Sequence, residues 1–292
     1  MMGYRPAMLL PNLTRRLERA KSLDPIVDAL TTAVNRVLPQ GPVKDVLHGR
    51  WLGHPFHPLL VSVPIGLWSS ASLLDFTTGE SGREAARRLV GAGVLAVAPT
   101  AAAGWADWSE LGSSSRPKRV GIVHAASNTV SAAFYGASWL ARRGGNHRRG
   151  RDLALLGAAS VAVGGYLGGH LSYNEGVGVS RNIDAQLKPT EWTDAAPAAN
   201  LPDDGVLGVH VGGQQVALVC SQGEVYAMGA TCSHLGGPLP QGAVEDGCLV
   251  CPWHGSRFRL RDGGVARGPA SVPQISYDVR TLAGRIQIKV RR

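Results

Sequence analysis

The sequence predicts a multi-domain chain with an all-α N-terminal half, folded as a four-helix transmembrane bundle, and an all-β C-terminal domain. Charged residues are only 17% of the 292 residues, against roughly 25% in soluble globular proteins. The N-terminal half contains four long stretches without a charged residue, and the C-terminal part contains short β-rich runs between turn residues. We therefore divide the chain into a basic amphipathic segment (1–50), a transmembrane domain (51–175), a linker (176–190) and a β domain (191–292).

The four charge-free stretches predict four membrane-spanning helices. They cover positions 51–74, 89–106, 120–141 and 153–174. Each is close to the length of a spanning helix, which needs about 20 mostly apolar residues. A buried helical bundle is the alternative, because Ala and Gly rather than Leu dominate these stretches. Closely spaced glycines favour the membrane, since helix backbones pack closely in lipid through small residues; they are Gly164, Gly165, Gly168 and Gly169.

The net charge of +9 comes entirely from positions 1–172. The basic residues lie in short clusters between apolar stretches, as in loops at a membrane surface, so we expect a lipid membrane and no nucleic acid as a partner.

Basic residues next to the spans are equally many on both sides, and those of the N-terminal segment favour cytoplasmic termini. Residues 1–40 are too charged for a signal peptide. A helical apolar spacing over 13–38 predicts a helix on the membrane surface. We expect a plasma-membrane protein whose C-terminal domain faces the cytoplasm.

Two mixed pairs of cysteine and histidine give the strongest chemical signal. Cys232 and His234 are followed, after sixteen residues, by Cys251 and His254. Each pair offers one soft anionic thiolate and one neutral imidazole, so two short loops present matching sets of metal ligands. A structural zinc site is the alternative, but zinc fingers usually pair Cys with Cys and His with His.

The two pairs, with their flanks 236–239 and 255–258, resemble those of the Rieske iron–sulfur family over about residues 191–290. The resemblance implies a small antiparallel β-sandwich with a 2Fe–2S cluster at one tip. Cys232 and Cys251 would hold one iron, and His234 and His254 the other, near solvent, as the electron exit. Residues 268–273 are similar to the proline-bearing loop that shields the cluster. The sequence agrees independently, because turn residues separate six β-rich runs; these are 206–211, 215–220, 224–228, 248–251, 275–280 and 285–290.

Two departures from the family pattern indicate its ferredoxin and oxygenase-type branch. High-potential members carry an extra cysteine in each ligand loop, and these two form a disulfide; Gly237 and Trp253 stand at the matching positions. Phe258 replaces a tyrosine that donates to a cluster ligand sulfur, while Ser256 is retained. Fewer donors to sulfur imply a potential at the low end of the roughly −150 to +300 mV Rieske range.

Four histidines lie at or within the apolar stretches: His54, His57, His124 and His170. An up-and-down bundle brings them to one end, and ionisable residues inside a membrane are candidates for function. They are candidate haem b ligands, ligands of another metal, quinone contacts, or structural groups that cap and bridge helices. The motif over 53–58 resembles a family of small four-helix bacterial membrane domains, over about residues 50–180. That resemblance implies no established activity.

The sequence therefore predicts a bacterial membrane-anchored electron carrier. It would pass single electrons between a redox partner protein and a membrane or soluble acceptor, without a substrate site of its own. Only 38 residues follow His254, too few for the mononuclear iron domain of a ring oxygenase. Donation of electrons to a separate oxygenase, or a role as a membrane redox sensor, are the alternatives.

Overall fold

The computed structural model describes residues 9–112, 115–182 and 188–291 and divides into two compact units. The helical unit comprises Met1–Pro39 and Phe56–Val177, and the β unit comprises Gln40–Pro55 and Gly178–Arg292. These units divide the chain differently from the sequence-based boundaries after residues 50, 175 and 190. Part of the predicted linker, residues 183–187, lies outside the described residues.

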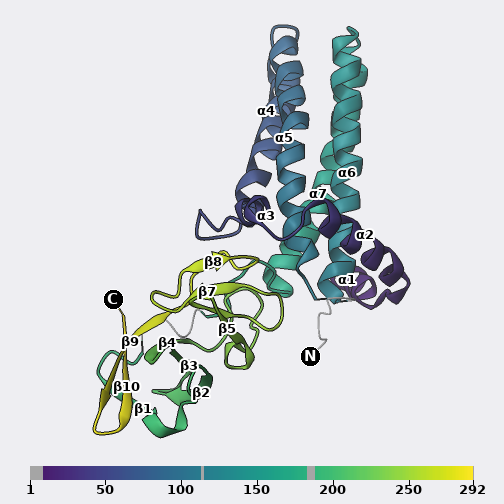
Figure 1. Cartoon of the computed structure of the whole chain (residues 1–292). Helices are drawn as coiled ribbons and strands as arrows, with labels where there is room; N and C mark the ends of the chain where they lie inside the picture. Colours follow the sequence, from purple (N-terminus) through teal and green to yellow (C-terminus); the bar gives the residue numbers. More distant parts are fainter. Residues whose placement is uncertain (1–8, 113–114, 183–187, 292) are drawn as a thin grey trace, which may run out of the picture. The chain divides into compact units, whose positions relative to one another are not determined.

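The helical unit contains two short helices followed by four long ones (Figure 1). Their bounds are α1 Leu9–Arg19, α2 Asp24–Val37, α4 His57–Thr77, α5 Arg83–Ser109, α6 Arg116–Arg143 and α7 His147–Gly169, with the 3₁₀ turn η1 Lys21–Leu23 and the π-helical turn η2 His170–Asn174. The long helices pack chiefly as two hairpins, α4 with α5 and α6 with α7. The predicted helical half and its four long helices are therefore confirmed.

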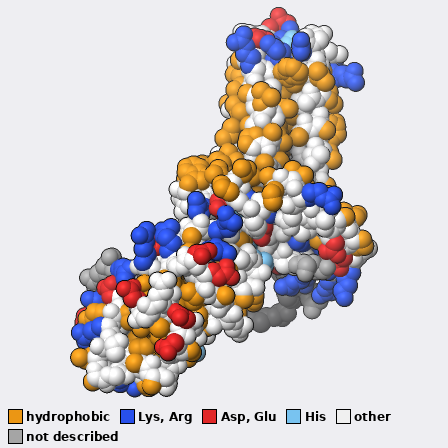
Figure 2. All heavy atoms as spheres, in the orientation of Figure 1, with side chains coloured by type: hydrophobic (Ala, Val, Ile, Leu, Met, Phe, Trp, Pro, Cys, Tyr) orange, Lys and Arg blue, Asp and Glu red, His pale blue; other side chains and the backbone are white. Residues whose placement is uncertain are grey.

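Of the helices that the structure describes, three are long and apolar enough to cross a membrane. They are α4, α5 and the continuous stretch His147–Asn174, with mean hydropathy of 1.5, 1.6 and 1.3. Helix α6, the third predicted span, is as long but more polar. Its polar groups face the neighbouring helix, since buried Ser131 and Ser138 donate hydrogen bonds to the carbonyls of Gly157 and Gly150 on α7 (3.0 and 2.6 Å). Figure 2 shows hydrophobic side chains along the sides of the helices and Lys and Arg gathered at the end of the two hairpins.

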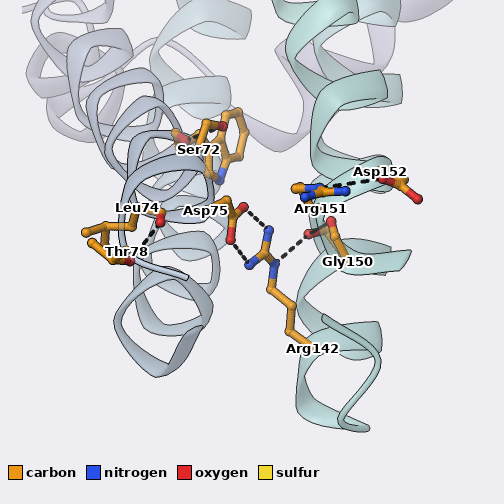
Figure 3. A network of polar contacts seen from close by, with 10 residues as sticks. Ser72, Leu74, Asp75, Thr78, Arg142, Gly150, Arg151 and Asp152 are labelled. Atoms are coloured by element: carbon orange, nitrogen blue, oxygen red, sulfur yellow. Dashed lines mark hydrogen bonds and ion pairs between the residues drawn. The ribbon is translucent and has the colours of Figure 1, made fainter. Parts of the chain in front are cut away.

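Two side-chain pairs join the hairpins across the core of the helical unit. Trp68 of α4 stacks on Tyr135 of α6, with ring centroids 3.9 Å apart and planes 8° from parallel. One layer further along, the buried guanidinium of Arg142 forms a bidentate ion pair with Asp75 (Figure 3), in which Nη1 lies 2.7 Å from Oδ1. Arg142 also donates to Ser138 Oγ at 3.2 Å. Both partners of this charge pair are buried, so they hold α4 and α6 together inside an apolar bundle.

The β unit consists of two antiparallel sheets, which confirms the predicted all-β fold. The six-stranded sheet has the order β1-β10-β9-β4-β3-β2, and the four-stranded sheet the order β5-β6-β7-β8. The strands are β1 Thr193–Pro197, β2 Val206–Val211, β3 Gln214–Ser221, β4 Glu224–Gly229, β5 Ala243–Glu245, β6 Cys248–Val250, β7 Arg257–Arg259, β8 Val265–Arg267, β9 Ser276–Leu282 and β10 Arg285–Val290. All six predicted β-rich runs are strands.

Two-residue turns fix the hairpins of this unit. The turns 212–213, 222–223, 246–247 and 283–284 have positive φ at both residues and glycine at the second. Such turns match the right-handed twist of the strands they join. The turn at 246–247 sets the register of β5 on β6 and thereby positions the ligand loop that follows β6.

Residues 40–55 belong to the β unit although the helical segment Phe56–Val177 separates them from its remainder. Helix α3 (Pro42–Leu47) presents buried Asp45, whose Oδ1 accepts a hydrogen bond from the Gly268 amide at 2.8 Å. Arg50 donates to the Ala266 carbonyl, and His48, also buried, lies beside Gly268. These contacts explain why the structural division falls before residue 56 and not after residue 50.

Candidate metal centre

Two loops of the β unit carry the four predicted ligands and have the same backbone design. The loop after β4 holds Cys232 and His234, and the loop after β6 holds Cys251 and His254. In each, the cysteine carbonyl accepts from the amide of a positive-φ glycine four residues later, at 2.9 Å from Gly236 and 3.1 Å from Gly255. Each cysteine amide in turn donates to a carbonyl of its own loop at 2.8 Å.

The two cysteine sulfurs that are predicted to be ligands lie together in the interior of the β unit. Cys232 and Cys251 are buried and share a hydrogen bond. This bond lowers the pKa of Cys251 to about 6 and raises that of Cys232, because the pair holds one proton between two sulfurs. Backbone amides also point at both sulfurs, those of His234 and Leu235 at Cys232 and those of Trp253 and His254 at Cys251. Such donors stabilise thiolates and reduced iron–sulfur clusters.

The imidazoles of His234 and His254 lie close together, with ring centroids 5.1 Å apart and planes at 90°. Nδ1 of His234 is buried without a hydrogen-bond partner. Burial lowers the pKa of His234 to about 3, and His254 and His48 contribute in the same direction. The ring is therefore neutral and its nitrogen is available to a metal. With about 2.0 Å from metal to nitrogen and about 1.1 Å from nitrogen to ring centroid, two imidazoles on one tetrahedral ion lie about 5 Å apart. The donor set fits the iron that two histidines would hold.

The loop at 268–273 is tied to both ligand loops. Ser233 Oγ donates to the Val272 carbonyl at 2.6 Å, and buried Ser256 Oγ accepts from the Ala270 amide at 3.0 Å. Because Ser256 accepts there, its own hydroxyl proton remains for another acceptor. Asp45 of α3 holds the start of the same loop through Gly268. The loop at 268–273 thus has three separate polar anchors.

Gly237 and Trp253 lie close together, as expected if they stand at the positions of the paired cysteines of high-potential Rieske proteins. A Cβ placed on Gly237 would lie 2.7 Å from Cys251 Sγ and 3.3 Å from the Trp253 ring. Phe258, at the position of the tyrosine donor, is fully buried in the core below the ligand loops.

The four histidines of the predicted bundle-end site separate into three places. His57 and His124 lie together in the helical unit, with ring centroids 6.4 Å apart. His170 instead contacts Glu18 of α1, with 2.9 Å between Nε2 and Oε1. His54 belongs to the β unit, is exposed, and its Nδ1 lies 3.0 Å from the Pro55 carbonyl.

The sequence analysis did not predict two groups of contacts, one around His170 in the helical unit and one at Gly268 in the β unit. Glu18 and Glu175 place carboxylate oxygens within 4.8 Å of a His170 nitrogen, beside a cavity of about 470 Å³. Asp45 reaches Gly268 across 223 residues of sequence. A local motif carries no signal for either contact, because both join distant segments.

Comparison with known proteins places two family matches on the chain. Residues 191–282 match the Rieske 2Fe-2S domain. Residues 53–181 match a family described as predicted membrane protein (DUF2231).

Relatives of the C-terminal domain include ferredoxin components of dioxygenase systems. The ferredoxin component of naphthalene 1,2-dioxygenase/salicylate 5-hydroxylase systems from Ralstonia sp is 31% identical over 99 residues, which is 34% of this chain and 95% of that protein. The naphthalene 1,2-dioxygenase ferredoxin component from Pseudomonas aeruginosa is 32% identical over 98 residues, or 34% and 94%. Among solved structures, the carbazole 1,9a-dioxygenase ferredoxin from Nocardioides aromaticivorans IC177 is 26% identical, covers 34% of this chain and 98% of its own, and has a TM-score of 0.33.

Proposed function

Because the chain belongs to the Rieske 2Fe–2S family through its C-terminal domain, we propose that it is a membrane-anchored carrier of single electrons. The observation that carries this proposal is the pairing of two buried, proton-sharing sulfurs with two imidazoles at the spacing of one tetrahedral ion. A 2Fe–2S cluster bound there supplies a one-electron couple.

The side chains divide the work of holding such a cluster. Cys232 and Cys251 would bind one iron as thiolates, and His234 and His254 the other as neutral imidazoles. Four backbone amides directed at the sulfurs would stabilise the added negative charge of the reduced state. The polar anchors of loop 268–273 would exclude water and keep the ligand loops in place during oxidation and reduction.

The helical unit would anchor the carrier in the plasma membrane. Support comes from the three apolar helices and from the predicted-membrane-protein match. The charges flanking the bundle do not orient it, because basic residues next to the spans are equally many on both sides. Three of them, Lys118, Arg119 and Arg142, are also buried and bonded to side chains of their own unit. The exposed basic residues of the N-terminal segment favour cytoplasmic termini.

The partner would be a protein that accepts or donates one electron. The ferredoxin relatives are named as components of dioxygenase systems, which favours a separate oxygenase as one acceptor. A second acceptor would be a redox group in the helical unit, where the candidate residues are His57 and His124. Haem b is the group we propose for it.

The test is metal analysis and EPR of the full chain, purified anaerobically in detergent. We expect acid-labile sulfide with iron and, after reduction, a signal of low average g value. Cys232→Ala should remove this signal. Cys220→Ala, a buried thiol of strand β3 outside the site, is the matched control and should retain it. A colourless protein, or one with zinc bound in place of iron, would contradict the proposal.

A further inference from the structure

The four long helices of the helical unit form an internal repeat of one helical hairpin. Three pairs of residues, one member on α4 and the other on α6, meet across the core: His57 with His124, Trp68 with Tyr135, and Asp75 with Arg142. The two members are equally far apart in the sequence in every pair. Hairpin α6–α7 thus repeats hairpin α4–α5, and the three pairs lie along the axis that relates them.

The second helix of each hairpin repeats as well. Gly93 on α5 and Gly157 on α7 give room to the Trp68 and Tyr135 rings, because a Cβ would come within 2.3 and 2.8 Å of them. Gly104 and Gly168, which have the same separation in the sequence as the first two glycines, do the same for the two histidines. A Cβ at these positions would lie 2.9 Å from His57 Cε1 and 3.0 Å from His124 Cε1.

Both imidazoles are held in the same way. His57 Nδ1 lies 2.9 Å from the Thr100 carbonyl, and His124 Nδ1 lies 2.8 Å from the Gly164 carbonyl. A carbonyl only accepts, so Nδ1 carries the proton in both rings and Nε2 has the lone pair. This arrangement, with Nδ1–H on a carbonyl and Nε2 left to a metal, is how proteins orient ligating histidines.

The amide of Asn128 does not occupy the ligating direction. Its Nδ2 is nearly equidistant from the two ring nitrogens of His124, at 3.4 Å from Nδ1 and 3.2 Å from Nε2. An atom on the axis of the Nε2 lone pair would lie much further from Nδ1. The Asn128 Nδ2 also donates a hydrogen bond to the His124 carbonyl at 2.9 Å, which holds the amide beside the ring.

The spacing of the rings distinguishes the metal geometry. The ring centroids are 6.4 Å apart and the planes are at 79°. Two imidazoles on opposite sides of one metal ion have centroids about 6.2 Å apart, taking about 2.0 Å from metal to nitrogen and about 1.1 Å from nitrogen to centroid, whereas tetrahedral ligands lie about 5 Å apart. The observed separation is thus closer to the value for rings on opposite sides of one ion than to the tetrahedral value.

The surroundings distinguish a haem from a bare ion. Among the described residues, the one group of three or more His, Cys, Asp or Glu with ligand atoms within 4.8 Å of one another is Glu18, His170 and Glu175. His57 and His124 thus have no third protein ligand of these types in the described part of the chain. A bare zinc ion takes three or four protein ligands. A haem brings four nitrogens of its own and needs only axial ligands.

We propose that the helical unit binds one haem b, with His57 and His124 as its axial ligands. This inference deepens the proposed function, on which it rests for the source of the electron. Reduction of ferric to ferrous haem takes up one electron, the number that a 2Fe–2S cluster releases, and breaks no bond. The next pair along the repeat, Trp68 and Tyr135, stacks ring on ring and contains no imidazole. We therefore expect one haem per chain.

The test is cofactor analysis of the full chain from cells supplied with a haem precursor. We expect three irons per chain, two with acid-labile sulfide and one as protoporphyrin haem in the pyridine haemochrome assay, with a low-spin spectrum. His57→Ala and His124→Ala should each lose the haem and keep the EPR signal of the cluster. The matched control His170→Ala changes a histidine of the same unit that binds Glu18 and should keep both.

Two further variants separate ligation from folding. His124→Gly should regain the low-spin spectrum when imidazole is added, which a purely structural histidine would not produce. Cys232→Ala should lose the cluster and keep the haem. Wild-type protein that contains the cluster but no haem would overturn this inference and leave the proposed electron carrier unaffected. Wild-type protein that contains haem but no cluster would contradict the proposed electron carrier and leave the haem site supported. Haem retained by both alanine variants, or no recovery with imidazole, would also overturn it.

Discussion

Each unit of the chain contains one pair of neighbouring imidazoles, and the two pairs differ in their spacing and in the groups that support them. His234 and His254 lie 5.1 Å apart in the β unit, and His57 and His124 lie 6.4 Å apart in the helical unit. The first pair is supported by loops that also carry two sulfurs. The second is supported by carbonyls of neighbouring helices. The positions of the supporting groups thus set the distance between the two rings of each pair, which is shorter in the β unit than in the helical unit.

The largest expected effect comes from removing a cysteine that belongs to the proposed cluster site alone and not to the histidine pair of the helical unit. Cys251→Ala deletes a thiolate shared with no group of the helical unit, so we expect complete loss of the cluster with the haem content unchanged. EPR and pyridine haemochrome measurements on the same sample report both results. Simultaneous loss of both cofactors would show that the two sites depend on each other and would break the comparison.

The next effect concerns the potential of the cluster. His254→Cys replaces a neutral ligand by an anion, which stabilises the oxidised state. Where a cluster forms, its midpoint potential should fall by on the order of 100 mV or more, since Cys₄ clusters lie well below Rieske centres. Redox titration followed by EPR measures this. Trp253→Phe, which alters only the neighbouring exposed side chain, should leave the potential nearly unchanged, and an equal fall in both variants would contradict the assignment of His254.

A third prediction concerns the buried charge pair of the helical repeat. Asp75→Asn leaves the Arg142 guanidinium buried without its counter-charge, so the free energy of unfolding should fall by about 3–5 kcal/mol. The double variant Asp75→Asn/Arg142→Met should lose less than the single one. Unfolding in mixed detergent micelles measures both. The control Glu80→Gln breaks an exposed ion pair with Arg83 and should cost about 0–1 kcal/mol. A loss as small for Asp75→Asn would contradict the structural role of the pair.

The last effect develops only in acid and is small near neutral pH: it is a pH dependence of the stability of the protein without its metals. Burial lowers the pKa of His234 to about 3. The folded chain therefore keeps this ring neutral at mildly acidic pH, whereas the unfolded chain protonates it once the pH falls below the ordinary pKa of histidine. Stability should therefore be complete above about pH 6.5 and fall as the pH drops towards 3, by up to roughly tenfold in the folding equilibrium per pH unit.

His234→Gln removes the titrating group and should flatten this dependence in an acid titration of the metal-free protein. His210→Gln, at an exposed position on strand β2, should not. If the two variants lose stability in acid to the same extent, the titrating group is not His234.

The sequence was sufficient for whatever is encoded locally. The ligand loops are short motifs whose cysteine, histidine and glycine act within a few residues of one another, and the strands follow from alternating runs and turns. The four long helices follow from apolar stretches, although α6 shows that polar residues facing a neighbouring helix make a span look less apolar.

What escaped prediction depends on contacts between distant segments. Asp45 reaches Gly268 across 223 residues and Glu18 reaches His170 across 152. One signal was present in the sequence: the constant offset between His57 and His124, between Trp68 and Tyr135, and between Asp75 and Arg142. Only a spatial contact shows that this offset joins facing residues and not merely equivalent ones.

The most direct test of the claim that two histidines bind the cluster is pulsed EPR of the reduced full chain, produced in cells that are supplied with ¹⁵N-labelled histidine. The account predicts hyperfine couplings from two imidazole nitrogens on the cluster in the wild type and from at most one in His234→Ala. A reduced cluster without histidine nitrogen couplings, or with the same two couplings after that substitution, would contradict it.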